Sequence, residues 1–252
     1  MGGVRIIAKG VDAEAYATEY AAPVRHALKG IHFLNTSLEK AARNYAPGKG
    51  IEQGSIHGAP GITAGYASIK SLSDFIQSGI PESDSMTIFC IARSLDSGLA
   101  SATRPSFLGT QQGVAAAGGT SDGINMYMTS AGGGMVSFTA AYGNNDADRT
   151  NVVCSVSWEN IKTFALFVAT ISSVGITFRD VTNNRTNTVT PPAGLPRRRT
   201  VNKLRLGSAF NAFGGTGDVA LVQVHSDLLA PAQIATTIDD LRAYALRKGI
   251  AV

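Results

Sequence analysis

The sequence predicts an all-β protein: a two-sheet antiparallel sandwich with a C-terminal helix and a short N-terminal Ala-rich leader. About eleven short runs rich in β-branched and aromatic residues alternate with turns built from Gly, Asn, Asp and Pro. The 252 residues include 28 Gly, and only 16% of the chain is charged, which is typical of a folded, turn-rich domain. No repeat of fixed period is present, so a propeller or solenoid is disfavoured.

The predicted strands follow one another from residue 31 onward. Two apolar runs, 86–93 and 163–171, are expected at the centre of a sheet because both of their faces are hydrophobic. The other candidates are 31–34, 66–70, 106–110, 124–129, 135–142, 151–156, 175–180, 186–190, 203–207 and 218–225.

The chain divides into a leader, residues 1–28, and a sandwich domain, residues 29–252. The leader is Ala-rich and shows no strand alternation, and Asp12 is suited to cap a short helix in it. Its apolar residues are expected to lie either on the sandwich or on a partner subunit; they are Tyr16, Tyr20, Val24 and Leu28.

The last strand and the helix behind it close the domain. Strict alternation places Val219 and Leu221 on one face of the strand and Val222 on the other. Pro231 fits the first turn of the helix, where its missing N–H is not needed, and Gly249 ends the helical run.

Charge and composition indicate which classes of binding partner the sequence disfavours. The net charge of +4 is small, and the basic triplet at 197–199 lacks aromatic interleaving, so it is expected to be a solvated loop and not a nucleic-acid site. Cys90 and Cys154 lie in apolar runs and are predicted to be buried free thiols. The sequence shows neither a membrane-spanning stretch nor a secretory signal, and the protein is expected to be made in a cytoplasm.

The order of these segments resembles a known family. The matching segments are 31–34, 65–69, 85–93, 203–207 and the closing strand and helix from residue 217. Together, over residues 30–250, they resemble a concanavalin A-like lectin jelly roll of the laminin-G type. The short, Met-initiated chain with its leader also resembles a bacteriophage virion protein of the tail, fibre or decoration class. That resemblance implies a homo-oligomer in contact with other virion proteins, assembled after synthesis in the host cytoplasm.

The resemblance also implies glycoside hydrolysis as a further function to test, but the residues do not favour it. A retaining glycosidase needs two carboxyl groups about 5–5.5 Å apart, and the nearest candidates, Glu82 and Asp84, follow Pro81 in a loop without a third acid. The histidines have no adjacent partner that defines a catalytic role; His32 and His225 are expected to be structural. The cysteines lack the spacing of a zinc site. The prediction is that the protein is not an enzyme.

The best candidate for a specific site is the loop from Tyr142 to Arg149. Its Asn144, Asn145, Asp146 and Asp148 offer the oxygen ligands that calcium prefers, and the resemblance implies that a sugar is bound beside such an ion. The same residues are ordinary turn formers, and this simpler interpretation is favoured.

A bound sugar also needs an aromatic ring to stack on, which Tyr142 or Trp158 offers. Trp158 is expected in the core instead, as the family's tryptophan often is.

Two functions therefore stay open, and the sequence favours the first because its fold signal is strong while no site signal is. The first is a structural and interaction protein of a phage particle, without catalysis. The second is a carbohydrate-binding module that recognises a host cell-surface glycan, with or without calcium.

Overall fold

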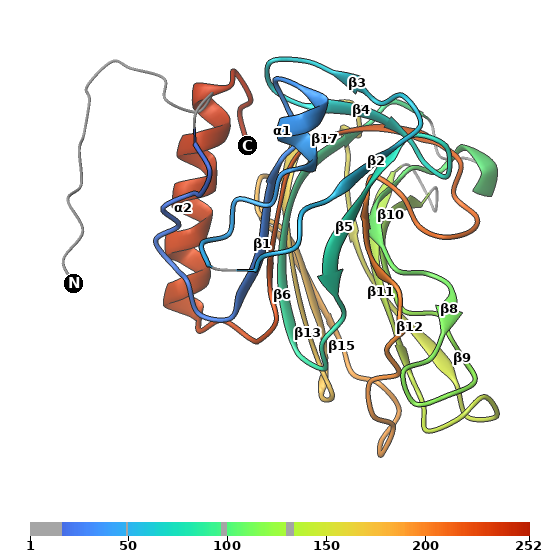
Figure 1. Cartoon of the computed structure of the whole chain (residues 1–252). Helices are drawn as coiled ribbons and strands as arrows, with labels where there is room; N and C mark the ends of the chain where they lie inside the picture. Colours follow the sequence, from blue (N-terminus) through green and yellow to red (C-terminus); the bar gives the residue numbers. More distant parts are fainter. Residues whose placement is uncertain (1–16, 49, 97–99, 130–133) are drawn as a thin grey trace.

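The computed structural model describes residues 17–252 except 49, 97–99 and 130–133. Two large antiparallel sheets enclose one core, and helix α2 (Pro231–Arg247) lies against the outer face of one of them (Figure 1). The predicted all-β sandwich with a C-terminal helix is thus confirmed. No helix in the described part of the chain is long and apolar enough to cross a lipid bilayer.

Sheet A, the sheet under α2, has the strand order β15-β14-β13-β6-β17-β4-β3, and β1 pairs with β17 beside β4. Its strands are β1 (Leu28–Phe33), β3 (Gly61–Ile62), β4 (Ala67–Lys70), β6 (Met86–Ser94), β13 (Ala165–Ser172), β14 (Gly175–Asp180), β15 (Arg185–Val189) and β17 (Thr216–His225).

Sheet B has seven strands in the order β12-β11-β10-β7-β16-β5-β2. They are β2 (Ser55–His57), β5 (Phe75–Pro81), β7 (Ser106–Gly109), β10 (Ile124–Thr129), β11 (Met135–Tyr142), β12 (Thr150–Ser157) and β16 (Lys203–Leu206). The remaining elements are the hairpin of β8 (Gly113–Val114) and β9 (Thr120–Ser121), helix α1 (Leu38–Ala42) and the 3-10 turn η2 (Ser101–Thr103).

A second apolar layer fixes α2 to sheet A. Leu241 and Tyr244 of the helix belong to the same buried cluster as Phe89 of β6 and Leu166 of β13. The helix ends as the sequence predicts, because Gly249 takes a left-handed conformation (φ +76°). The middle of sheet A, formed by β17, β6 and β13, is therefore apolar on both faces.

The faces of β17 differ from the predicted alternation. A bulge between Val219 and Leu221 shifts the pairing with β6. An extra residue in one strand reverses the side-chain alternation beyond it. Val219 and Val222 consequently both enter the inner core, while Leu221 packs under α2. Period-two spacing alone does not reveal such a bulge.

Part of the predicted leader packs on the sandwich. The ring of Tyr20 lies 5.1 Å from Phe33 and 6.4 Å from Tyr244, and its hydroxyl donates to both carboxylate oxygens of Asp240 at 3.0 Å. Val24 is buried in the cluster under α2. Asp12 and Tyr16, with the helix expected there, lie outside the described residues, and the domain division at residue 28 stays a prediction.

Strand β5 is the main element that the sequence pattern misses. Its residues, FIQSGIP, contain Gly79 and end in Pro81, both unfavourable in strands. A Cβ at Gly79 would stand 2.4 Å from the Cβ of Glu52, so the close approach of this segment requires glycine. β5 nevertheless links β16 to β2 in sheet B.

The buried thiols and histidines are confirmed. Cys90 and Cys154 are free and buried. His225 Nδ1 lies 2.7 Å from the His26 carbonyl oxygen, and His32 Nδ1 lies 3.4 Å from that of Ala41. Burial lowers the pKa of His32 to about 4, because desolvation disfavours the charged ring.

Removing a core side chain of α2 should destabilise the fold. Leu241 is fully buried, whereas Leu246 in the same helix is 70% exposed. We expect Leu241→Ala to lower the free energy of unfolding by about 2–5 kcal/mol and Leu246→Ala by less than about 0.5 kcal/mol. Urea unfolding of both variants measures the difference; equal losses would mean that α2 does not pack on sheet A.

Acid should destabilise the protein through His32. The folded pKa of His32 is below the unfolded value, so the unfolded state binds more protons as pH falls from about 6.5 to about 4. Stability is complete above this window and declines through it. The His32 contribution at pH 4 is a loss of about 3 kcal/mol relative to pH 7.5. His32→Gln should show a correspondingly smaller loss in urea titrations at the two pH values; identical losses would contradict a neutral buried ring.

Candidate ligand-binding surfaces

The two aromatic residues predicted for sugar stacking lie in the core. The Trp158 ring is fully buried, 5.1 Å from Phe167 and 5.8 Å from Phe107. Tyr142 is also fully buried, and its hydroxyl donates to the Ser172 carbonyl oxygen at 2.9 Å. Neither ring presents a face to a sugar in this structure. For Trp158 the core alternative is the one that the structure supports.

The loop after Tyr142 is held by its own side chains. Asp148 Oδ1 accepts the backbone N–H groups of Asn144 and Asn145 at 2.8 and 2.9 Å, and Oδ2 accepts from Asn144 Nδ2 at 2.7 Å. These bonds, first that from the Asn145 backbone, lower the pKa of Asp148. This is the turn chemistry of Asx residues.

Asp146 serves a different partner. It accepts from Arg198 Nη2 at 2.6 Å and from the Thr120 backbone N–H at 2.9 Å, and the Thr120 bond is the main reason that its pKa is lowered. The two loop aspartates thus bind separate groups. Within the described residues, no cluster of three or more His, Cys, Asp or Glu side chains is placed to hold a metal ion.

The expectation of a solvated basic loop at 197–199 is wrong for two of its three residues. The side chains of Arg197 and Arg198 are only 1% and 2% exposed, while Arg199 is 35% exposed. A buried guanidinium needs a counter-charge and full hydrogen bonding. Each arginine has an acid: Arg197 binds Glu82, Arg198 binds Asp146 and Arg199 binds Asp84.

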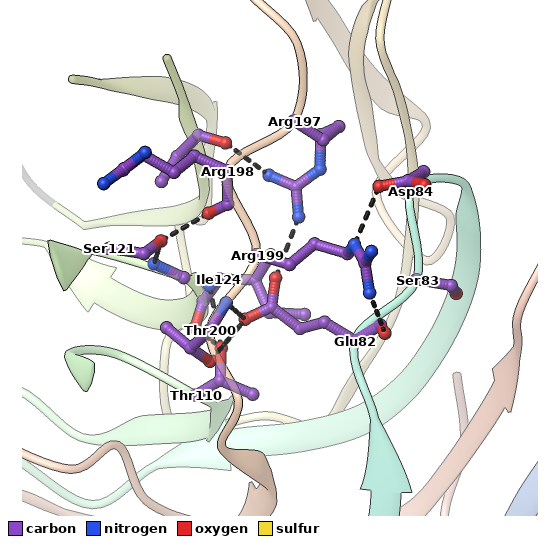
Figure 2. Close-up of polar contacts among 12 residues, drawn as sticks. Glu82, Ser83, Asp84, Thr110, Ser121, Ile124, Arg197, Arg198, Arg199 and Thr200 are labelled. Carbon is purple, nitrogen blue, oxygen red and sulfur yellow. Dashed lines mark hydrogen bonds and ion pairs between the residues drawn. The ribbon is translucent and has the colours of Figure 1, made fainter. Parts of the chain in front are cut away.

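Glu82 is the centre of this network (Figure 2). Its Oε2 accepts from Arg197 Nη2 at 3.0 Å, and its Oε1 accepts from the Thr110 hydroxyl and from the Thr200 hydroxyl at 2.9 Å. Arg197 Nη1 continues to the Ala141 carbonyl oxygen at 2.8 Å. The pair therefore joins the ends of β5, β7 and β11 to the segment before β16.

A hollow of about 250 Å³ lies beside this network. It is lined by Gly143 and Asn144 of the predicted loop and by residues 116–117 and 196–199. Since each of the three arginines already has a carboxylate, the hollow offers polar walls without an uncompensated charge. We interpret the network as structural, at the rim of the sandwich.

The outer face of sheet B carries a row of mostly polar residues. Alternate residues of its strands, among them Leu206, Met126 and Phe138, enter the core, so their neighbours point outward. Cross-strand pairing aligns one outward position from each strand in a row: Ser55, Gln77, Arg205, Gly109, Asn125, Thr139 and Val153.

The middle of this row is covered by loops. Asn125 Nδ2 donates to Gln111 Oε1 at 2.9 Å, and the ring of Phe213 lies 4.5 Å from that of Tyr127. Phe213 has a positive φ of 57°, which is uncommon for a bulky residue. Such strained conformations cost free energy and are found most often at functional sites. The uncovered part of the face is the end formed by β16, β5 and β2.

A second hollow, of about 400 Å³, lies at this uncovered end. Phe210, Gln77, Ser55, Asn202, Lys203 and Glu52 are among its lining residues. The guanidinium of Arg205 lies 3.6 Å from the centre of the Phe210 ring and 4.3 Å from that of Phe75. Burial lowers the pKa of Arg205. Sequence alternation in 203–206 places Arg205 outward, but nothing in the pattern distinguishes it from an ordinary surface arginine.

Comparison with known proteins shows the fold. No protein-family model and no curated protein matches the chain. Solved structures do match, among them the binding domain of botulinum neurotoxin DC in complex with SialylT, with 9% identity, a TM-score of 0.56 and coverage of 85% of this chain and 52% of that chain. The receptor-binding domain of the mosaic serotype C/D matches with 8% identity, a TM-score of 0.57 and coverage of 86% and 52%.

A third structure concerns type C neurotoxin, whose cell entry depends on two ganglioside molecules; it has 8% identity and a TM-score of 0.55 and covers 85% of this chain and 51% of that chain. The chain spans about half the length of these neighbours. At such low identity the likeness shows the fold alone, a jelly-roll sandwich, as predicted. The first two of these neighbours are binding domains.

Removing one charge of the buried Glu82–Arg197 pair should lower the free energy of unfolding more than removing both charges together. Glu82→Gln leaves Arg197 charged and buried without its acid, and we expect a loss of about 3–5 kcal/mol in the free energy of unfolding. The double variant Glu82→Gln with Arg197→Met removes both charges and should lose clearly less than the sum of the single variants.

The matched control is Glu159→Gln, because the Glu159–Arg185 pair is exposed, at 79% and 51%. Its cost should be below about 1 kcal/mol. Urea unfolding of the parent protein, the single variants Glu82→Gln and Arg197→Met, the double variant and Glu159→Gln measures these losses. Equal effects at Glu82 and Glu159 would contradict the central place of the buried pair.

Proposed function

We propose that the chain is a non-enzymatic carbohydrate-binding domain that receives a glycan on the uncovered end of the outer face of sheet B. The observation that carries the proposal is the hollow of about 400 Å³, in which the Phe210 ring stands beside Gln77, Ser55 and Asn202. A binding site of this kind combines an apolar ring surface with a few placed polar groups. The complex of one neighbour with SialylT, and the dependence of type C neurotoxin cell entry on two ganglioside molecules, support this choice by analogy.

Absence of catalysis belongs to the same proposal. The acids nearest to the glycosidase pattern, Glu82 and Asp84, are paired with Arg197 and Arg199. The Glu82 side chain is also fully buried, out of hydrogen-bond reach of a substrate on the surface.

Calcium is not needed in this proposal. The loop that offered its ligands uses Asp146 and Asp148 for internal hydrogen bonds, and Asn144 and Asn145 are partners of Asp148. A calcium-assisted glycan site at this loop is the alternative, and chelation distinguishes the two.

A place in a bacteriophage particle remains a prediction from the sequence resemblance. It includes contact with other virion proteins and a homo-oligomeric state, and it is compatible with glycan recognition at a host surface. Light scattering of the purified protein and its recovery with purified particles would test these partners directly.

Glycan binding should depend on Phe210. We expect the purified protein to bind members of a bacterial and animal glycan array, and Phe210→Ala to weaken that binding at least about fivefold, ~1 kcal/mol, because the ring surface is lost. The control is Val174→Ala, since Val174 is 76% exposed between β13 and β14 of sheet A. It should bind like the parent protein.

Chelation with EDTA should leave the affinity unchanged. Loss of glycan binding on chelation would show that the site is the 142–149 loop. The same conclusion would follow if the Asp146→Ala, Asp148→Ala double variant lost glycan binding while Phe210→Ala kept it. Failure of every glycan to bind would overturn the proposed function itself.

A further inference from the structure

Arg205 differs from the arginines at the rim of the sandwich. Its Nε donates to Gln77 Oε1 at 3.3 Å, and its Nη1 donates to the Ala209 carbonyl oxygen at 3.1 Å. Both acceptors are neutral. Among the described residues no carboxylate pairs with Arg205, whereas Arg197, Arg198 and Arg199 each have one.

The cation is held in place but not neutralised. The rings of Phe75 and Phe210 lie within 4.3 Å of the guanidinium carbon, and such contacts orient the plane of an arginine. Partial burial makes the charge costly, which is the reason that the pKa of Arg205 is lowered. The Nη2 group has no hydrogen-bond partner in the described part of the chain, and it is not among the atoms sealed from solvent.

The surroundings supply the rest of a site for one negative charge. Two residues that touch Arg205, Gln77 and Phe210, also line the hollow of about 400 Å³. The other charges at this hollow cancel, because Lys203 Nζ binds Glu52 at 2.6 Å. Gln77 is itself fixed by bonds from its Nε2 to the carbonyl oxygens of Lys203 and Leu204 at 3.1 and 3.2 Å.

We infer that the ligand is an acidic saccharide whose carboxylate or sulfate group pairs with the free Nη2 edge of Arg205 while its ring lies in the adjoining hollow. The inference rests on the proposed glycan-binding function and names its substrate class. A planar guanidinium is the donor best matched to a carboxylate or sulfate. The anion would also supply the counter-charge that this partly buried cation lacks.

The test compares matched oligosaccharides that differ only in their terminal unit: neutral, uronate-bearing, sialate-bearing and sulfated. We expect the parent protein to bind at least one acidic class at least about tenfold more tightly than the neutral form, ~1.4 kcal/mol, with a preference that weakens as salt is raised. Arg205→Gln should abolish the preference. Arg205→Lys keeps the charge without the planar fork and should retain part of it.

The matched control is Arg179→Gln, which removes the same charge from β14 in sheet A and should keep the full preference. Thermal melting establishes that each variant is folded, and Arg205→Lys keeps the test valid if Arg205→Gln unfolds. Equal affinity of the parent protein for acidic and neutral forms would overturn the inference and leave the proposed function standing. An acidic preference that survives Arg205→Gln, or disappears equally in Arg179→Gln, would also overturn it. No binding to any member would overturn both.

Discussion

The buried pair of Glu82 and Arg197 is the constraint on which one end of the sandwich depends. Neither side chain is more than 1% exposed, so each charge requires the other and the hydrogen bonds around both. Thr110 and Thr200 donate to Glu82, and Arg197 donates to the Ala141 carbonyl oxygen. Because these groups come from segments far apart in sequence, the pair specifies how the connections at the rim of sheet B meet (Figure 2). The predicted loop with Asn144 and Asp148 directly follows β11 at this rim, so the position of the rim determines the position of the loop.

The two outer faces of the sandwich have different roles because of what covers them. Sheet A carries Phe89, Leu166 and Leu221 outward, and α2 with part of the 17–28 segment buries them. Sheet B carries polar residues outward, and no α-helix of the described residues lies over it (Figure 1). Loops cover its centre around Asn125, which leaves the end near Arg205 accessible. The proposed glycan site is therefore located by the asymmetry of the fold as well as by the chemistry of its side chains.

The sequence predicts those parts of the structure that depend on local pattern. Apolar runs identify β6 and β13, and Pro231 and Gly249 identify the ends of α2 with small error. The sequence pattern does not predict strand β5, because Gly79 is required by the close approach of Glu52. That requirement comes from tertiary packing and not from local sequence. The same is true of the candidate sites: Tyr142 and Trp158 are attractive aromatic residues in the sequence, yet packing places both in the core. The roles of Arg197 and Arg205 depend on whether an acid from a distant segment reaches them, which no local pattern contains.

The position of β17 has a consequence for biosynthesis. This strand is the last of the sandwich in sequence order, yet it lies inside sheet A, with β6 on one edge and both β1 and β4 on the other. While a ribosome is still making residues 216–225, three earlier strands lack their partner and expose hydrogen-bonding edges. Such long-range pairings also form slowly, because the entropy cost of closing a long loop comes before the favourable free energy of the contacts. Nascent chains are thus vulnerable to aggregation until β17 emerges and inserts between strands that are already present.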